Sequence, residues 1–130
     1  MNIFARLGAI AYILWGFLHI QAARMVYTLG DTLDPGMVQA RIYQDAFNLL
    51  FFALFAIVIA FWLNWKNDKT GYWANLIVIS AADVGFIYYV LMPGYVPMIP
   101  GGLGPLLWII AVTFSTIGIR RSRHPNKLRM

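Results

Sequence analysis

The sequence predicts an all-α fold, a four-helix transmembrane bundle that forms a single domain over residues 1–130. Hydrophobic residues make up 61% of the chain and charged residues only 12%, whereas soluble domains carry roughly 25% charged residues. Four apolar segments of about 17–21 residues are each long enough to cross a bilayer. The expected helices cover about 3–25, 35–65, 71–92 and 104–120, followed by a basic tail at 120–130.

The first apolar segment, from about Ile3 to Ala23, is expected to be a retained helix. A secretory signal peptide needs a basic start and a cleavage site of small residues. Here the start holds only Arg6, and the sequence from Ile20 to Ala23 lacks a small-x-small pattern. Cleavage would also leave three crossings, which does not fit the distribution of basic residues among the loops.

The second and third segments are expected to form an antiparallel hairpin. Asp34, Pro35 and Gly36 precede the second segment. Asp at the N-cap with Pro at the first helical position is a good start signal, so this helix should begin near Pro35, after an outer loop at about 24–34. The connection from Asn64 to Gly71 is short and polar, which favours a tight turn between neighbouring helices.

The fourth segment follows an unusual connection at 93–104, which holds three Pro, four Gly and no charge. Irregular backbone at membrane depth is tolerated only against protein or water. We therefore expect this connection to fold back as a cap on the outer end of the bundle. Pro105 is expected to restart the helix.

The basic residues predict the orientation of the bundle. With four crossings, one side of the membrane holds eight of them and the other side only two, Arg24 and Arg41. This positive-inside bias predicts that the N- and C-termini are cytoplasmic, in a multi-pass protein of the bacterial inner membrane. The eight residues are Arg6, Lys66, Lys69, Arg120, Arg121, Arg123, Lys127 and Arg129.

The lipid bilayer is thus the first expected partner, because a basic juxtamembrane tail contacts anionic headgroups. The net charge of +5 does not indicate nucleic acid binding, since the charge is confined to particular loops. The absence of Cys excludes disulfides and thiolate metal sites. His19 is the only His inside a span, so we expect no metal and no cofactor. A haem held by one His, or by a His and a Met, is the alternative.

Asp83 is the most informative single residue. It lies in the otherwise apolar stretch from Tyr72 to Met92, in a chain without any Glu. An acidic side chain at mid-membrane costs at least about 2.5–3.5 kcal/mol, so it normally faces a partner or a cavity. We expect the Asp83 side chain to face the interior of the bundle, about halfway across the membrane.

Other polar side chains gather in the outer half of the predicted bundle. His19 lies in the outer third of the first helix, and Tyr12 and Trp15 share its helical stripe. Arg41, Asp45 and Asn48 fall at i, i+4 and i+7, with Gln44 four residues before Asn48. This segregation predicts a polar pocket open to the outer leaflet. Its expected substrate-binding residues are Asn48, Gln44, Asp45, Arg41, Arg24, Tyr12 and Trp15.

Within that pocket, Asp83 and His19 are the candidate catalytic residues. An imidazole both gives and takes a proton near neutral pH, and a His–Asp pair is competent for general acid–base chemistry. The structural alternative is interhelical hydrogen bonding, with Asp83 bound to Asn48, Gln44 or Thr113. Arg41 and Asp45 have their own alternative, a local ion pair at the membrane rim that leaves Gln44 and Asn48 to point into the bundle.

Three functions fit these residues. The first is a membrane protein for a lipophilic small molecule with a polar head, either a binding protein or an acid–base enzyme of the isomerase or cyclase type. The second is a non-catalytic accessory subunit of a larger membrane complex, in which the polar residues join the helices. The third is a homo-oligomeric channel or proton pathway in which Asp83 lines a symmetric pore.

The opening Arg6, Leu7 and Gly8, followed by Gly16 and a polar outer end of the first helix, resembles small four-helix integral membrane proteins of the DoxX-like kind. The resemblance covers the layout of the whole chain. It implies a compact membrane bundle that accompanies membrane redox systems. Some members carry paired Cys residues, and this chain has none.

Overall fold

A computed structural model describes residues 2–124 of the chain. Within this part every regular element is a helix, which confirms the all-α prediction. Four helical stretches are long and apolar enough to cross a membrane, namely Ile3–Asp31, Met37–Lys66, Lys69–Leu91 and Met98–Arg123. The elements are α1 (Ile3–Asp31), α2 (Met37–Trp62), η1 (Asn64–Lys66), α3 (Lys69–Phe86), η2 (Ile87–Leu91), α4 (Met98–Gly101) and α5 (Leu103–Arg123).

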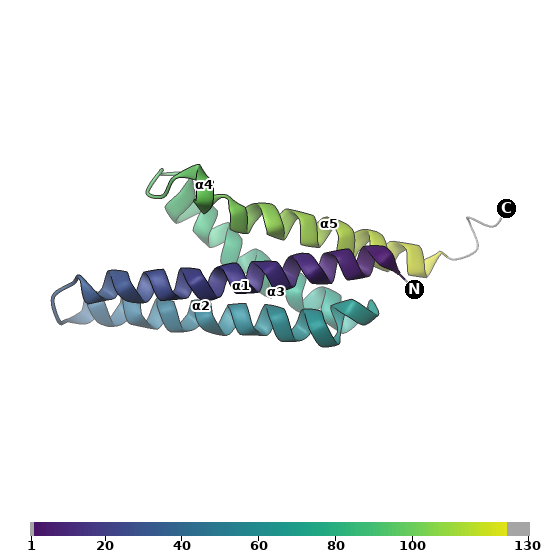
Figure 1. The fold of residues 1–130 in the computed structure, drawn as a ribbon, viewed down its shortest axis with the longest axis horizontal. Helices are drawn as coiled ribbons and strands as arrows, with labels where there is room; N and C mark the ends of the chain where they lie inside the picture. Colours follow the sequence, from purple (N-terminus) through teal and green to yellow (C-terminus); the bar gives the residue numbers. More distant parts are fainter. Residues whose placement is uncertain (1, 125–130) are drawn as a thin grey trace.

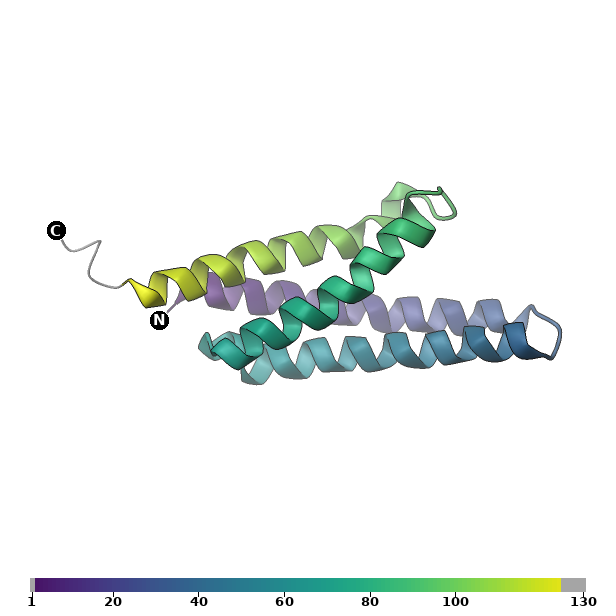
Figure 2. The same cartoon turned by 180° about the vertical axis from the view of Figure 1, so that it is seen from behind.

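The helices do not all run side by side. α1 and α2 form an antiparallel hairpin over their whole length, and α5 packs along the N-terminal half of α1 (Figure 1). α3 starts beside the end of α2, diverges from it and crosses towards the start of α5 (Figure 2). We call the end that holds Ile3, η1 and Arg123 the basic end, and the end that holds the α1–α2 connection the hairpin end.

Small residues allow α1 to pack closely against its neighbours. A Cβ on Gly16 would lie 2.8 Å from the Ala53 carbonyl oxygen and would overlap Ile57. A Cβ on Gly8 would lie 2.9 Å from the backbone nitrogen of Ser115. Small residues at helix interfaces let backbones approach within a membrane, so these two glycines set how near α2 and α5 lie to α1.

The α1–α2 connection is shorter than expected. α1 continues to Asp31 rather than ending near residue 25. Side chains from α2 hold this extension, because Tyr43 Oη donates to Asp31 Oδ1 at 2.6 Å and Gln39 Nε2 donates to the Gly30 carbonyl at 3.0 Å. Between residue 25 and Gly30 the sequence holds no Gly or Pro, and these polar contacts satisfy the groups at the helix end.

The start of α2 also differs from the prediction. The N-cap is Gly36, without a side-chain hydrogen bond, and the helix begins at Met37. The prediction of Asp34 as the N-cap and Pro35 as the first helical residue was therefore wrong, since both residues lie in the connection before the helix. The predicted short turn between the second and third helices is confirmed. Asn67 adopts a left-handed φ of 59°, and Asp68 caps α3 by accepting from two backbone amides.

The last part of the third span changes its helix type. From Ile87 to Leu91 the backbone forms a π-helix, followed by a turn and the short helix α4. This connection lies beside the start of α5 and apart from the α1–α2 connection (Figure 1), so it does not cap the whole outer end of the bundle as expected. α5 begins at Leu103, and Pro105 falls in its first turn, where a missing N–H costs nothing.

Cationic side chains meet aromatic rings at the basic end. The Arg6 guanidinium lies 4.9 Å above the Trp65 ring, and that of Arg121 lies 4.4 Å above the Phe4 ring. Arg120, Arg121 and Arg123 form the last turn of α5. The remaining cations of the predicted tail, Lys127 and Arg129, lie outside the described residues.

Candidate functional site

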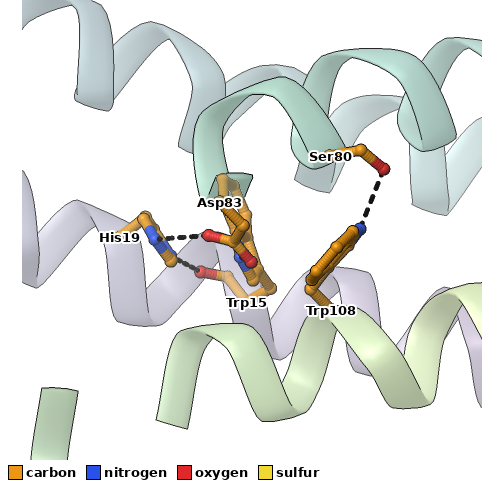
Figure 3. Close-up of polar contacts among 5 residues, drawn as sticks. All are labelled: Trp15, His19, Ser80, Asp83 and Trp108. Carbon is orange, nitrogen blue, oxygen red and sulfur yellow. Dashed lines mark hydrogen bonds and ion pairs between the residues drawn. The ribbon is translucent and has the colours of Figure 1, made fainter. Parts of the chain in front are cut away.

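The Asp83 carboxylate is fully buried between α1 and α3. Trp15 Nε1 donates to Asp83 Oδ2 at 3.0 Å, and His19 Nε2 lies 3.8 Å from Asp83 Oδ1. Figure 3 shows both α1 side chains directed at the carboxylate. The expectation that Asp83 faces the bundle interior is confirmed. Its partners are Trp15 and His19, and not the amides of Gln44 or Asn48. We call Trp15, His19 and Asp83 the central cluster.

Helical spacing places the two α1 members of the cluster. Trp15 and His19 are four residues apart, so they lie on one face of α1, and their rings stack with centroids 3.6 Å apart. A Cβ on Gly104 would lie 2.9 Å from His19 Cε1, so the start of α5 closes against the imidazole. On α3, Ile79 precedes Asp83 by one turn and is also fully buried. This close packing fixes the orientations of the Trp15 and His19 rings.

The hydrogen bonds define where the imidazole carries its proton. His19 Nδ1 lies 2.8 Å from the Trp15 carbonyl oxygen. A carbonyl only accepts, so Nδ1 is the donor, and in a neutral ring Nε2 then presents a lone pair to Asp83. Two acceptors facing each other repel. One proton on His19 Nε2 or on the carboxyl therefore makes this pair attractive.

One oxygen of the carboxylate lacks a hydrogen bond. Asp83 Oδ1 is buried without a partner, because the 3.8 Å distance to His19 Nε2 exceeds that of a hydrogen bond. Buried polar atoms in proteins are nearly always paired. The Asp83–His19 contact is thus an ion-pair distance rather than a completed hydrogen bond, and the indole supplies the one close donor.

A second indole, from α5, contacts the same face of α3. Trp108 Nε1 on α5 donates to Ser80 Oγ on α3 at 2.9 Å (Figure 3). Ser80 precedes Asp83 by three residues, so neighbouring positions of α3 receive indole donors from α5 and from α1. The oblique path of α3 (Figure 2) brings Ser80 within reach of this indole.

Polar side chains are also buried towards the basic end. Asn75 on α3 is fully buried and donates to Asn64 Oδ1 at 2.9 Å and to the Ala56 carbonyl at 3.3 Å. Nearby, Asn2 and Asn67 both donate to the Gly118 carbonyl, at 2.9 Å and 3.0 Å. Buried polar side chains are therefore more numerous at this end than the sequence analysis expected, since it placed most polar candidates in the outer half. These asparagines join the four long helices at the basic end.

The predicted binding residues of the second helix do not reach the central cluster. Arg41, Gln44, Asp45 and Asn48 are all exposed. Gln44 and Asn48 were expected to point into the bundle, and this is wrong because α3 has diverged from α2 at their level (Figure 2). Arg41 Nη1 donates to Gln44 Oε1 at 2.9 Å, in place of the expected ion pair with Asp45.

The remaining predicted site residues divide between core and surface. Arg24 is exposed, while Tyr12 and Trp15 are 1% and 0% exposed. His19 is 9% exposed, so little of this residue reaches the surface. A pocket open to the outer leaflet around Asp83 is not present, since its carboxylate has no exposed surface. Among residues 2–124 no three His, Cys, Asp or Glu side chains gather as metal ligands do.

The fold and the site define an α-helical membrane protein with four candidate spans and a sealed polar centre. Comparison of the chain with protein-family models, curated proteins and solved structures found no match. The resemblance to DoxX-like proteins therefore stays a prediction.

Proposed function

We propose that this protein is a non-catalytic subunit of a membrane complex. The observation that carries the proposal is the complete burial of Asp83, whose carboxylate lies at 0% exposure behind Trp15 and His19. A general acid or base has to approach the proton it transfers within about 2.6–3.2 Å, directly or through one water. A carboxylate enclosed by two side chains of its own chain serves the packing of α1 against α3 instead.

The central cluster has the features of an interhelical clamp. The indole N–H of Trp15 is satisfied only by the carboxylate of Asp83, and a hydrogen bond to a charged group contributes about 1.5–3 kcal/mol. Ser80 with Trp108, and Asn75 with Asn64, supply two further polar contacts of α3. α3 crosses the bundle obliquely, so these contacts stabilise a helix whose own apolar packing is limited.

In this proposal the basic end is cytoplasmic and the protein lies in the inner membrane. The cations of that end, among them Arg6, Lys66, Lys69 and the three arginines that end α5, lie on one side of the four spans. Loops rich in Lys and Arg stay on the cytoplasmic side. A reporter enzyme fused after residue 130 tests this, because one that works only in the cytoplasm should be active.

Two substitutions of Asp83 test the non-catalytic role. Asp83→Asn keeps an oxygen that accepts from Trp15, so the purified protein should keep most of its thermal stability in detergent and any protein that co-purifies with it. Asp83→Leu removes the acceptor and should lower the melting temperature clearly. A small molecule that co-purifies with the wild type and is lost in the well-folded Asp83→Asn variant would contradict the proposal.

The partial exposure of His19 supports a second candidate function. This residue is 9% exposed, and the unpaired Oδ1 of Asp83 faces its Nε2. This arrangement supports the alternative of a binding protein or acid–base enzyme for a lipophilic molecule, in which His19 touches the ligand and Asp83 holds the proton. Mass spectrometry of molecules bound after mild extraction, compared between wild type and His19→Phe, tests this alternative.

A further inference from the structure

The half of α2 nearer the hairpin end carries polar side chains that no other helix covers. Arg41, Gln44, Asp45 and Asn48, which we call the α2 polar stripe, share one helical face and are all exposed. Towards the basic end α3 covers the continuation of this face, where Asn75 donates to the Ala56 carbonyl. The stripe is therefore exposed because α3 leaves α2 (Figure 2).

The depth of Asn48 makes its exposure costly. At a rise of 1.5 Å per residue, Asn48 lies about 21 Å along the helix from Trp62. If Trp62 marks one interface, a hydrocarbon core of about 30 Å places Asn48 roughly 9 Å below the other. Arg41 and Gln44 reach the headgroups from their positions nearer the hairpin end. The Asn48 amide is left in hydrocarbon, where an unpaired amide is unfavourable.

We propose that a second copy of this chain covers the α2 polar stripe, with the two α2 helices parallel about a two-fold axis along the membrane normal. This inference rests on the proposed function as a membrane subunit, and it names the first partner of that subunit.

The composition of the stripe favours a second copy. A two-fold axis along the membrane normal brings each residue to the depth of its counterpart. The Asn48 amide both donates and accepts, so two copies satisfy each other. Arg41 and Asp45 have opposite charges and lie one turn apart, so the guanidinium of each copy lies within reach of the Asp45 carboxylate of the other. The stripe is thus complementary to itself.

The structure also leaves room beside the stripe. A Cβ on Gly85 of α3 would have no atom within 4 Å, and Val84 and Tyr88 are 56% and 63% exposed. At this level α3 has also diverged from α2 (Figure 2). No helix within residues 2–124 of the same chain covers this side of α2, so a helix of another copy can contact it.

Oxidative cross-linking of single cysteines in native membranes tests the geometry. The chain has no Cys of its own, so each introduced thiol reports alone. Asn48→Cys should form a disulfide-linked dimer, since residues on the axis fall within the distance of about 4.4–6.8 Å that a disulfide spans between Cα atoms. Leu50→Cys is the control. Leu50 is 39% exposed but lies about 160° around the helix from Asn48, and it should stay monomeric.

The mass of the purified full chain in mild detergent tests the energetics. The wild type should have twice the mass of a 14.8 kDa chain, and Asn48→Leu should weaken the dimer about threefold to fifteenfold for each interhelical hydrogen bond lost. Gln21→Leu removes an exposed amide from α1 and should leave the dimer unchanged.

The outcomes separate this inference from the proposed function. Equal cross-linking of both cysteines, or a monomeric wild type, would overturn the two-fold contact. A monomer that co-purifies with a different protein at fixed stoichiometry would overturn the second copy and leave the role as a subunit intact. A monomer without any protein partner would contradict both.

Discussion

Trp15 on α1 and Asp83 on α3 are joined by a hydrogen bond of 3.0 Å between two side chains that are both 0% exposed. The carboxylate is thereby removed from lipid, and the indole N–H gains its acceptor. Each group is costly to bury alone, so neither residue can be replaced without changing the environment of the other.

Replacement of Trp15 should therefore destabilise the bundle more than its change in volume suggests. Trp15→Phe keeps an aromatic ring against His19 but removes the only close donor to Asp83. We expect the free energy of unfolding in mixed micelles to fall by about 1.5–3 kcal/mol. Trp62→Phe is the control, since Trp62 is 60% exposed and should change stability by less than about 0.5 kcal/mol. Equal effects of the two variants would show that the hydrogen bond does not stabilise the fold.

The two glycine environments give a prediction about helix packing. Gly16→Ala places a methyl group 2.8 Å from the Ala53 carbonyl oxygen and against Ile57, and overpacking of this kind costs about 1–3 kcal/mol. Gly85→Ala places a methyl group in open space and should be neutral or stabilising by up to about 1 kcal/mol through helix propensity. Thermal unfolding of both variants in the same detergent measures the contrast. A stable Gly16→Ala protein would mean that α1 and α2 lie further apart than described.

At the basic end, Asn75 should be as important as the central cluster. Asn75→Leu keeps the number and branching of the side-chain heavy atoms but leaves Asn64 Oδ1 without its donor, so we expect a loss of about 1–3 kcal/mol. Thr113→Val changes an exposed position of α5 and serves as the control. Limited proteolysis at the α2–α3 connection provides the readout, because η1 should open more often when Asn64 is released. Identical cleavage rates in the two variants would argue against this role of Asn75.

The central cluster shows what the sequence could and could not predict. The energetic cost of an acid in a membrane was enough to predict that Asp83 faces inwards, and helical spacing placed Trp15 and His19 on one face of α1. The partner could not be chosen, because periodicity gives the face of a helix but not the helix it meets. Gln44 and Asn48 had the right spacing and depth to reach Asp83, yet the oblique path of α3 leaves them exposed.

The end of α1 and the partner of Trp108 could not be predicted, because contacts with other helices determine both. α1 extends to Asp31 because Tyr43 and Gln39 of α2 donate hydrogen bonds to polar groups in its last turn. The local sequence of α1 does not predict these contacts. The indole N–H of Trp108 donates to Ser80, and residue type alone does not predict this contact between α5 and α3. A polar residue three positions from an intramembrane acid was the one available signal that α3 has more than one partner.

A double-mutant cycle on Trp15 and Asp83 tests the central claim most directly. Its four proteins are the wild type, Trp15→Phe, Asp83→Leu and the double variant, each unfolded reversibly in the same mixed micelles. Since each single change leaves the other buried group unpaired, the double variant should be more stable than the sum of the single losses predicts, by about 1–2 kcal/mol. Losses that add to within about 0.5 kcal/mol would show that the two side chains do not interact, and would contradict the sealed cluster.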